Sequence, residues 1–386
     1  MAMREGLIDI ADVTTVDIYK NHECIQAGRK YKISQPQTIL WFLPIVTHAL
    51  KGGVRTVFEF SQHLSHKYNT QAVFVIYSFS GKDFDIRPLT RSLRQNFPKL
   101  RFIVRKFRRN IYSEQDLPPS EAAFCTLWTT SFLLLRYNRT RRKFYFLQDY
   151  EPMFYSGGAL YMIIEQTYRF GFSAIANTPG VGSKYLQYSE DMVSFQPGVN
   201  RTIFHSRDSE AETEYGVAQI VFYGRPEIKR NGFFLGLDIL KGVKDQMGDA
   251  VRIVSAGAEW DPADFGVEGV VENLGLLATM EEVADLYRAS SLGLVLMATP
   301  HPSYQPLEYM ACGCVVATNI NEANKWLLND QNALLVEPLA EVAADKIVKL
   351  LKAPMRRREL VQEAYKTVND LDWDKAYQVI EERLLA

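Results

Sequence analysis

The chain has 386 residues, 47% of them hydrophobic and 23% charged, which is enough apolar material for about two domains and argues against intrinsic disorder. Its net charge of -1 excludes the global positive field that steers many proteins to nucleic acid. The four cysteines form no disulfide framework or zinc motif, and the sequence shows neither a signal peptide nor a run of transmembrane length. We therefore expect a cytoplasmic protein.

The positive charge is locally clustered. No acidic residue occurs between positions 86 and 113, and a second basic cluster follows at 136–143. We expect these clusters to be solvated faces, and the alternative is peripheral contact with anionic lipid at the inner face of the membrane. The members considered are Arg91, Arg94, Lys99, Arg101, Arg105, Lys106, Arg108 and Arg109 in the first cluster and Arg136, Arg139, Arg141, Arg142 and Lys143 in the second.

Apolar strand patterns alternate with helical patterns along the first half of the chain. The strands are almost continuously apolar, which is typical of parallel sheets that are covered by helices on both faces. Residues 1–35 are predicted to be a polar lead-in of uncertain structure. Strands are predicted over 38–46, 71–79, 101–107, 122–128, 143–148 and 172–177, and helices over 52–68 and 158–171.

The alternation restarts after a polar stretch at 205–216, which we take as a domain boundary. We predict an N-terminal acceptor domain over 36–205, a C-terminal donor domain over 206–365 and a final helical segment over 366–386. The fold class is α/β, with two doubly wound Rossmann-like domains facing a central cleft. In the second domain, strands are predicted over 219–224, 251–257, 270–275, 292–299, 314–319 and 333–338, and helices over 232–248, 280–290 and 340–352.

Two loops of the first domain carry candidate site residues, because ligands of open parallel sheets bind at the carboxyl ends of the strands. Gly52 and Gly53 open a helix after the first strand, where backbone amides can approach an anion. The alternative is that Gly52 and Gly53 form a tight turn that binds no ligand. Asp149 and Glu151 follow a later strand, and on an extended chain they point the same way. Either one is a candidate base or hydroxyl contact, and a helix cap is the alternative.

Two further loops lie in the second domain. Arg225, Lys229 and Arg230 follow a strand and precede a helix, an arrangement that suits a diphosphate, although exposed cations are the alternative. In "TPHPSYQPLEYMACG" a broken strand leads into a helix. Free amides at the start of that helix can bind phosphate oxygens, and Glu308 lies in its first turn. Simple complementarity with the helix dipole is the alternative for Glu308.

These loops resemble those of retaining GT-B glycosyltransferases, in particular family four and its bacterial rhamnosyltransferase relatives. The segments "VFYGRPEIKRNG", "VENLGLLATMEEVADLYRASSLGLVLMAT", "PLEYMACGCVVATN" and "LDWDKAYQVIEERL" carry the likeness, which covers nearly the whole chain. The resemblance implies transfer of a sugar from a nucleotide diphosphate to a hydroxyl of a growing surface glycan. It implies no cofactor and no metal, so we read the Asp-x-Asp of "KDFD" at 82–85 as chance.

The resemblance also implies roles for single residues. Glu308 matches the glutamate that holds the ribose, Ser303 and Tyr304 match amides around the distal phosphate, and Arg225 matches the phosphate arginine. We favour Arg230 over Lys229 as its companion cation. The remaining donor-side positions are His301, the base-bordering pair Gly275 and Leu276, and the glycine pair Gly52 and Gly53 near the transferred sugar.

One departure from the family pattern bears on the donor. Pro300 stands where the family has a glutamate near the donor sugar, which fits a 6-deoxy sugar such as rhamnose from dTDP-rhamnose. The acceptor is then a glycan, for which a lipid-linked form is one alternative, and no nucleic-acid partner is expected. The alternatives are a UDP- or GDP-hexose donor, a nucleotide-sugar epimerase of similar build, and a non-catalytic nucleotide-sugar-binding protein.

Overall fold

The computed structural model describes residues 13–50, 52–108, 113–206 and 217–386. Arg109 of the first basic cluster and most of the predicted boundary stretch lie outside these residues. The chain forms two compact units. Unit 1 comprises Met1–Phe195 and Ala376–Ala386, and unit 2 comprises Gln196–Lys375.

Unit 1 is built on a seven-stranded parallel sheet with the order β3-β2-β1-β4-β5-β6-β7. Parallel strands with helices on both faces bury alternate residues on each side. Leu40 and Phe42 face one apolar layer, whereas Trp41 between them stacks on Phe124 at 4.0 Å between ring centroids. The strands are β1 (Thr38–Pro44), β2 (Gln71–Ser78), β3 (Phe102–Arg108), β4 (Ser120–Cys125), β5 (Thr140–Leu147), β6 (Ser173–Asn177) and β7 (Met192–Phe195).

The sequence analysis predicts two of the helices of unit 1 that precede β7 and misses the others. Part of the predicted lead-in forms one of these, α2, whose N-terminus is closed by a capping box of Thr14 and Asp17. Asn21 on this helix accepts a hydrogen bond from the buried Lys143 of β5 at 2.9 Å. The helices are α2 (Thr15–Gly28), α3 (Val54–Tyr68), α4 (Arg87–Asn96), α5 (Trp128–Arg136), α6 (Ala159–Thr167) and α7 (Pro179–Tyr185).

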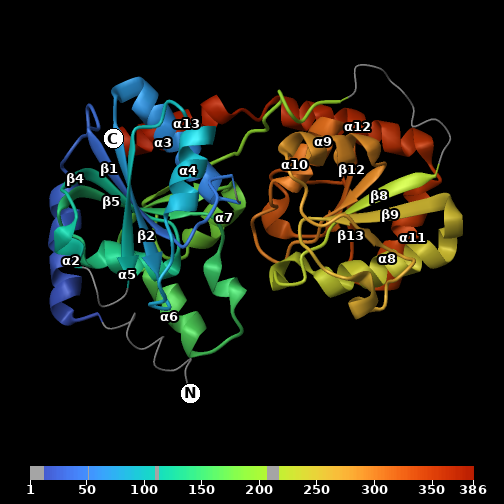
Figure 1. Cartoon of the computed structure of the whole chain (residues 1–386), viewed down its shortest axis with the longest axis horizontal. Helices are drawn as coiled ribbons and strands as arrows, with labels where there is room; N and C mark the ends of the chain where they lie inside the picture. The colour runs from blue at the N-terminus through green and yellow to red at the C-terminus, as the bar shows by residue number, and fades with distance from the viewer. Residues whose placement is uncertain (1–12, 51, 109–112, 207–216) are drawn as a thin grey trace. The chain divides into compact units, whose positions relative to one another are not determined.

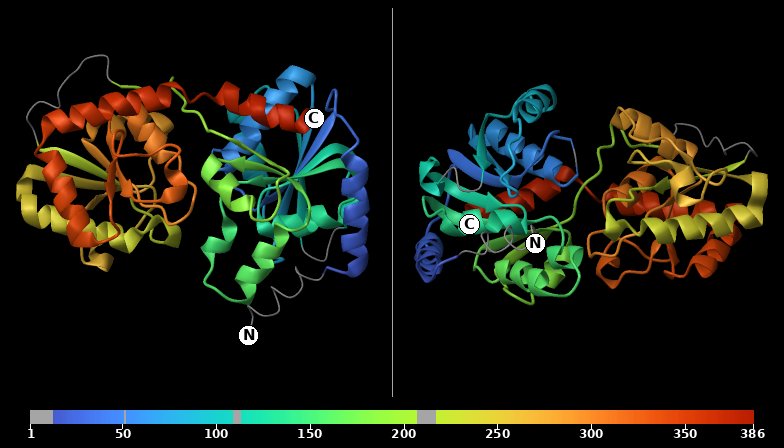
Figure 2. Two further views of the ribbon diagram at one scale, coloured as in Figure 1. Left: turned by 180° about the vertical axis from the view of Figure 1, so that it is seen from behind. Right: turned by 60° about the horizontal axis from the view of Figure 1, so that its bottom comes forward.

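The chain's last helix, α13 (Trp373–Leu385), belongs largely to unit 1. Figure 2 shows it, in red, beside α3 in blue. The carboxylate of Glu381 accepts from Tyr68 and pairs with His63 and Lys67 of α3, at 2.5 to 2.7 Å. These contacts explain why a helix so late in the sequence packs with the first sheet.

Unit 2 has a six-stranded parallel sheet with the order β10-β9-β8-β11-β12-β13. In Figure 1, α8 and α11 lie below this sheet, and α9, α10 and α12 lie above it. Ile220 and Phe222 of β8 face the α8 layer, and Val221 faces the other. The strands are β8 (Ala218–Tyr223), β9 (Val251–Ala256), β10 (Glu272–Asn273), β11 (Leu292–Leu294), β12 (Val315–Asn319) and β13 (Leu334–Val336).

The helices of unit 2 follow the strands in turn, as the doubly wound pattern requires. They are α8 (Phe233–Met247), α9 (Met280–Ala289), α10 (Gln305–Cys312), α11 (Ala340–Leu351) and α12 (Pro354–Asn369). The predicted strand at 270–275 is reduced to the two residues of β10. Among the described residues, none of the helices combines the length and the apolar character that a membrane span requires.

Candidate functional site

The carboxyl edge of the unit 2 sheet brings the predicted donor residues into neighbouring loops. Phe222 of β8 is in register with Leu294 of β11, and Tyr223 is in register with Ala256 of β9. The loop with Arg225 therefore lies between the loop that leads to Gly275 and the loop with His301. Such a row of loops at the carboxyl ends of parallel strands is where open α/β sheets bind their ligands.

Arg225 is fixed by the last residue of β8. Its Nη1 donates to the phenolic oxygen of Tyr223 at 2.9 Å, and its guanidinium lies 5.6 Å from the centre of that ring. The side chain is half-buried, and its hydrogen bond with Tyr223 holds the planar guanidinium in place. A guanidinium held in this way suits planar recognition of phosphate oxygens.

The next two cations in the chain, Lys229 and Arg230, lie in different environments. Lys229 and Arg230 lie in a short 3-10 helix, η3 (Lys229–Asn231), where Lys229 is exposed and Arg230 is half-buried. The carbonyl oxygen of Arg230 accepts from the amide of Ala298 at 2.9 Å, which joins this turn to the loop after β11. The backbone of Arg230 is thus tied to that loop, and of the two cations Arg230 is the less exposed.

His301 is buried and neutral. Burial, followed by the nearby charge of Arg230, lowers the pKa of His301 to about 3. Its Nδ1 accepts a hydrogen bond from the backbone amide of Ser303 at 2.8 Å, and Ser303 has a positive φ of 69°. The amide of Ser303 is therefore engaged by His301, and it can bind a phosphate only if the ring gives it up.

Tyr304 and Glu308 mark the beginning of α10. The ring of Tyr304 packs edge-on between His301 and Trp373, with centroids 5.6 and 6.0 Å away. Glu308 lies in the first turn, half-buried, where the helix dipole stabilises a carboxylate. Burial is the main cause that raises the pKa of Tyr287 and Tyr309 well above the ordinary value, and the charge of Glu308 makes a smaller contribution.

The loop with Gly275 and Leu276 is held by an acid that the sequence did not reveal. Glu259 accepts from the amide of Leu276 at 3.0 Å, and a Cβ atom at Gly275 would overlap its carboxylate. Gly275 also has a positive φ of 66°, so glycine is required there on two grounds. The side chain of Leu276 is 62% exposed, which leaves an apolar surface at the sheet edge.

Two asparagines also hold the site and were missed by the sequence reasoning. The side chain of Asn319, at the end of β12, exchanges two hydrogen bonds with the backbone of Met297, at 2.8 and 3.0 Å. Asn321 donates to the carbonyl oxygen of Thr299 at 2.7 Å. These amides fix the segment that leads to His301. The one sequence feature that could have indicated these asparagines is a polar residue at or just after the end of a buried strand.

The first-unit candidates form a second group at the carboxyl edge of the other sheet. Gly52 has a positive φ of 53° with open space around its Cα, and Gly53 precedes α3. A Cβ atom at Gly53 would overlap the side-chain amide of Gln148, which follows β5. The glycine loop after β1 is thus packed against the loop that carries Asp149.

Asp149 and Glu151 do not share an extended segment. Asp149 is buried, and its Oδ1 accepts from the amide of Tyr150 at 2.8 Å. Glu151 instead begins a 3-10 helix, η2 (Glu151–Phe154), and points inward. It is 1% exposed, and its Oε2 accepts from the amide of Trp128 at 2.5 Å, where α5 begins. Burial raises the pKa of Glu151 to about 8, against the opposing effect of that amide.

Replacing Glu151 with glutamine is expected to stabilise the protein at pH 8 and above. The unfolded carboxyl loses its proton near pH 4.5, whereas the folded one keeps it until about pH 8. Wild-type stability therefore falls, relative to the variant, as the pH rises through this window, by an amount of the order of a few kcal/mol. Urea denaturation at pH 5 and at pH 8.5 measures it, with Glu382→Gln on an exposed side chain as control. An equal difference at both pH values would contradict the raised pKa.

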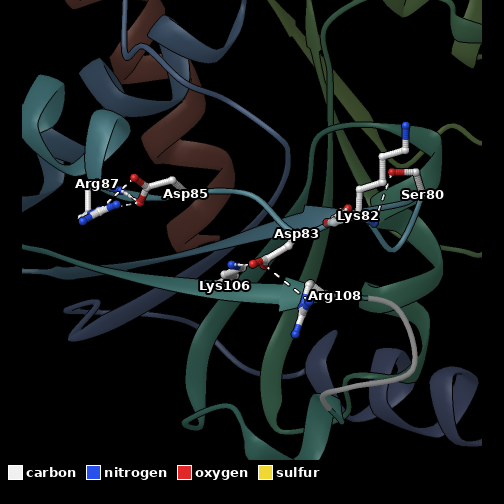
Figure 3. A network of polar contacts seen from close by, with 8 residues as sticks. Ser80, Lys82, Asp83, Asp85, Arg87, Lys106 and Arg108 are labelled. Carbon is white, nitrogen blue, oxygen red and sulfur yellow. Dashed lines mark hydrogen bonds and ion pairs between the residues drawn. The ribbon is translucent and has the colours of Figure 1, made fainter.

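The Asp-x-Asp at 82–85 pairs with cations of the basic cluster (Figure 3). Asp83 forms ion pairs with Lys106 and, at 3.5 Å, with Arg108, and Asp85 pairs with Arg87 at 2.8 Å. These residues, except Arg108, and Phe84 line a surface hollow of about 400 Å³. Part of the first basic cluster is thus neutralised within the chain. No group of three or more potential metal ligands occurs among the described residues.

The second basic cluster is not a solvated face throughout. Lys143 is 4% exposed and donates to Asn21, Asn138 and the carbonyl oxygen of Leu135. Arg136 pairs with Glu114 at 2.9 Å. The expectation of solvation is wrong for Lys143, because its side chain is buried and donates to three acceptors within the fold.

Comparison with known proteins gives one family match and one curated relative. Residues 218–352 match the family described as WsaF, C-terminal domain. The O-antigen biosynthesis protein RfbC of Myxococcus xanthus is 36% identical over 345 residues, which cover 88% of this chain. The chain spans about a quarter of that protein, 26% of its length.

Solved structures share the fold over about nine-tenths of the chain. Sucrose-phosphate synthase from Thermosynechococcus elongatus superposes with a TM-score of 0.67 at 15% identity, covering 90% of this chain and 98% of the other. Anabaena HepE in complex with UDP and glucose gives a TM-score of 0.69 at 16% identity, covering 90% and 99%. Likeness at this identity shows the fold, and the chain has the GT-B fold that the sequence analysis predicts.

Proposed function

We propose that this chain transfers a sugar from a nucleotide diphosphate sugar to a hydroxyl of a bacterial surface glycan. The observation that carries the proposal is the placement of Arg225, Arg230 and Glu308 on adjoining loops at one sheet edge. Two guanidinium groups and a helix N-terminus suit a diphosphate, and a carboxylate suits a hydroxyl of the nucleotide's pentose. The RfbC relative supports a surface glycan as the product.

The finer part of the proposal concerns the donor. Pro300 offers no hydrogen-bonding side chain at the turn into α10, and the neighbouring His301 is neutral. Such a turn suits a 6-deoxy sugar, and so we propose rhamnose from dTDP-rhamnose. The HepE complex with UDP and glucose favours the alternative of a UDP-hexose.

The proposed chemistry needs no protein nucleophile. Arg225 and Arg230 would stabilise the departing diphosphate, and fixed donors of this kind contribute strongly where charge develops. Holding the acceptor hydroxyl in line with the sugar supplies the rest. With no covalent enzyme intermediate, same-face attack gives retention, and Asp149 is the candidate contact for the acceptor hydroxyl.

Contact with a membrane surface is a separate part of the proposal. Arg91 and Arg94 are exposed on α4, and neither has a counter-ion among the described residues. They would attract anionic headgroups and so bring the enzyme to a lipid-linked acceptor. The proposal predicts that vesicles containing anionic lipid retain the wild-type protein better than an Arg91→Ala, Arg94→Ala variant.

A calorimetric comparison of dTDP, UDP and GDP tests the donor assignment. We expect dTDP to bind most tightly, because the proposed donor carries it; dTDP differs from the other two in its base and in lacking the 2′-hydroxyl. Tighter binding of UDP or GDP would favour the hexose alternative. A failure to bind any of the three diphosphates at millimolar concentration would contradict the proposed function itself.

A further inference from the structure

The carboxyl edge of the unit 1 sheet contains a side-chain amide whose donor is not used. Gln148 directly follows β5, and its Nε2 is buried with no hydrogen-bond partner among the residues that the structure describes. A buried polar group without a partner costs about 1 to 3 kcal/mol. Such groups are uncommon in folded proteins, and an acceptor supplied by a ligand is one explanation.

Two other strand ends hold this amide in place. Its Oε1 accepts from Nδ2 of Asn177, the last residue of β6, at 3.3 Å. On the other side it packs on Gly53, where any side chain would overlap it. The carbonyl end of the amide is therefore fixed by protein, and the amino end is the one left to bind something else.

The backbone after Asn177 is held in an uncommon conformation. Thr178 has a φ of 103°, and its amide donates to the carbonyl oxygens of Ala176 and Phe195 at 3.0 and 3.1 Å. Its hydroxyl accepts from Val181 at the start of α7. A strained residue that its surroundings fix in this way keeps Asn177, and through it the amide of Gln148, in one position.

The neighbouring charge indicates which ligand the amide would accept. Asp149 is the next residue in the chain, and its charge contributes to the raised pKa of Glu151 after burial. A second anion, such as a phosphate, would be repelled there. A sugar hydroxyl is neutral and can accept from the amide without that repulsion.

We infer that Gln148, positioned by Asn177 and Gly53, binds a saccharide hydroxyl at this edge of unit 1. Gln148 then belongs with Asp149 to a saccharide subsite. The inference rests on the proposed function, because the saccharide is either the sugar of the donor or the glycan acceptor. The inference also explains why position 53 is a glycine, because a Cβ atom there would overlap the amide of Gln148.

The test compares Gln148→Leu with wild type in calorimetric titrations of three ligands: dTDP alone, dTDP-rhamnose and a short rhamnan. Leucine has nearly the same shape and no hydrogen-bonding group. We expect binding of dTDP to be unchanged and that of one saccharide ligand to weaken about tenfold. The saccharide that weakens identifies the source of the hydroxyl. Gln166→Leu, on an exposed side chain of α6, is the matched control.

A second comparison separates a direct contact from a structural effect. Analogues of the weakened ligand that lack one hydroxyl should include one for which wild type and Gln148→Leu bind equally. A structural role would leave the difference unchanged across all analogues, and this result would overturn the inference. Should the leucine variant fail to fold, Gln148→Glu replaces it: a carboxylate accepts from a hydroxyl but repels a phosphate.

The two proposals fail in different ways. If wild type and Gln148→Leu bind all three ligands alike, the amide meets only water, and the inference fails while the proposed function stands. If wild type binds neither nucleotide sugar nor glycan, the proposed function fails, and the inference falls with it.

Discussion

Replacing Glu308 with alanine is expected to weaken binding of the nucleotide sugar about 10- to 100-fold. Hydrogen bonds to a charged group contribute about 1.5 to 3 kcal/mol, and the carboxylate can accept from the 3′-hydroxyl of the donor's deoxyribose. Its half-buried position in the first turn of α10 keeps it in one orientation. Calorimetric titration with the intact donor measures the loss.

The matched control is Glu322→Ala, because Glu322 is an exposed acid whose one recorded partner is Lys325. We expect that variant to bind the donor as wild type does. Loss of the favourable helix dipole interaction in Glu308→Ala costs only about 0.3 to 1 kcal/mol of stability, so the fold should survive. Unchanged donor affinity in a folded Glu308→Ala protein would remove this carboxylate from the site.

Replacing Arg225 with alanine is expected to lower kcat by about 100- to 1,000-fold. This magnitude is typical when one fixed donor to a developing negative charge is removed. The half-buried guanidinium is held against Tyr223 before any substrate arrives, so its stabilisation of the departing diphosphate needs no reorganisation. Steady-state kinetics at saturating donor separates this loss of kcat from a loss of binding.

Two further variants sharpen the test of Arg225. Arg225→Lys keeps the charge but loses the planar fork, and it should recover only part of kcat. Tyr223→Phe keeps the aromatic ring and removes the oxygen that accepts from Arg225, so a decrease of a few fold is expected from looser positioning. A wild-type kcat in Arg225→Ala would contradict a role in leaving-group stabilisation.

Most strands of the two sheets could be predicted because they are apolar runs, although the four-residue β7 was missed. Alternate residues of β8 face opposite apolar layers, and this double burial produces the continuous pattern. The short β10 shows the limit of that rule, because Glu272 and Asn273 carry a strand without an apolar run. Helix α2 was missed for a related reason: its sequence is largely polar, and its anchor is a buried contact with Lys143.

From the sequence, the site could be predicted only for residues that directly follow a strand, because the strand end fixes where they lie. Strand ends placed Arg225 and the α10 turn at one edge, but nothing in the sequence shows which of Lys229 and Arg230 is half-buried. The inward turn of Glu151 depends on the amide of Trp128, 23 residues away. The contact of Gln148 with Asn177 likewise joins residues 29 positions apart, so it is visible only in three dimensions.

The most direct test of the proposed function is transfer itself. The protein is incubated with labelled dTDP-rhamnose, UDP-glucose or a GDP-hexose, each with a short rhamnan acceptor, and the labelled glycan is separated and counted. We expect label in the glycan from dTDP-rhamnose, and its loss in the Arg225→Ala variant. Tight nucleotide binding with no labelled product from any of the donors would contradict the account and favour a non-catalytic binding protein.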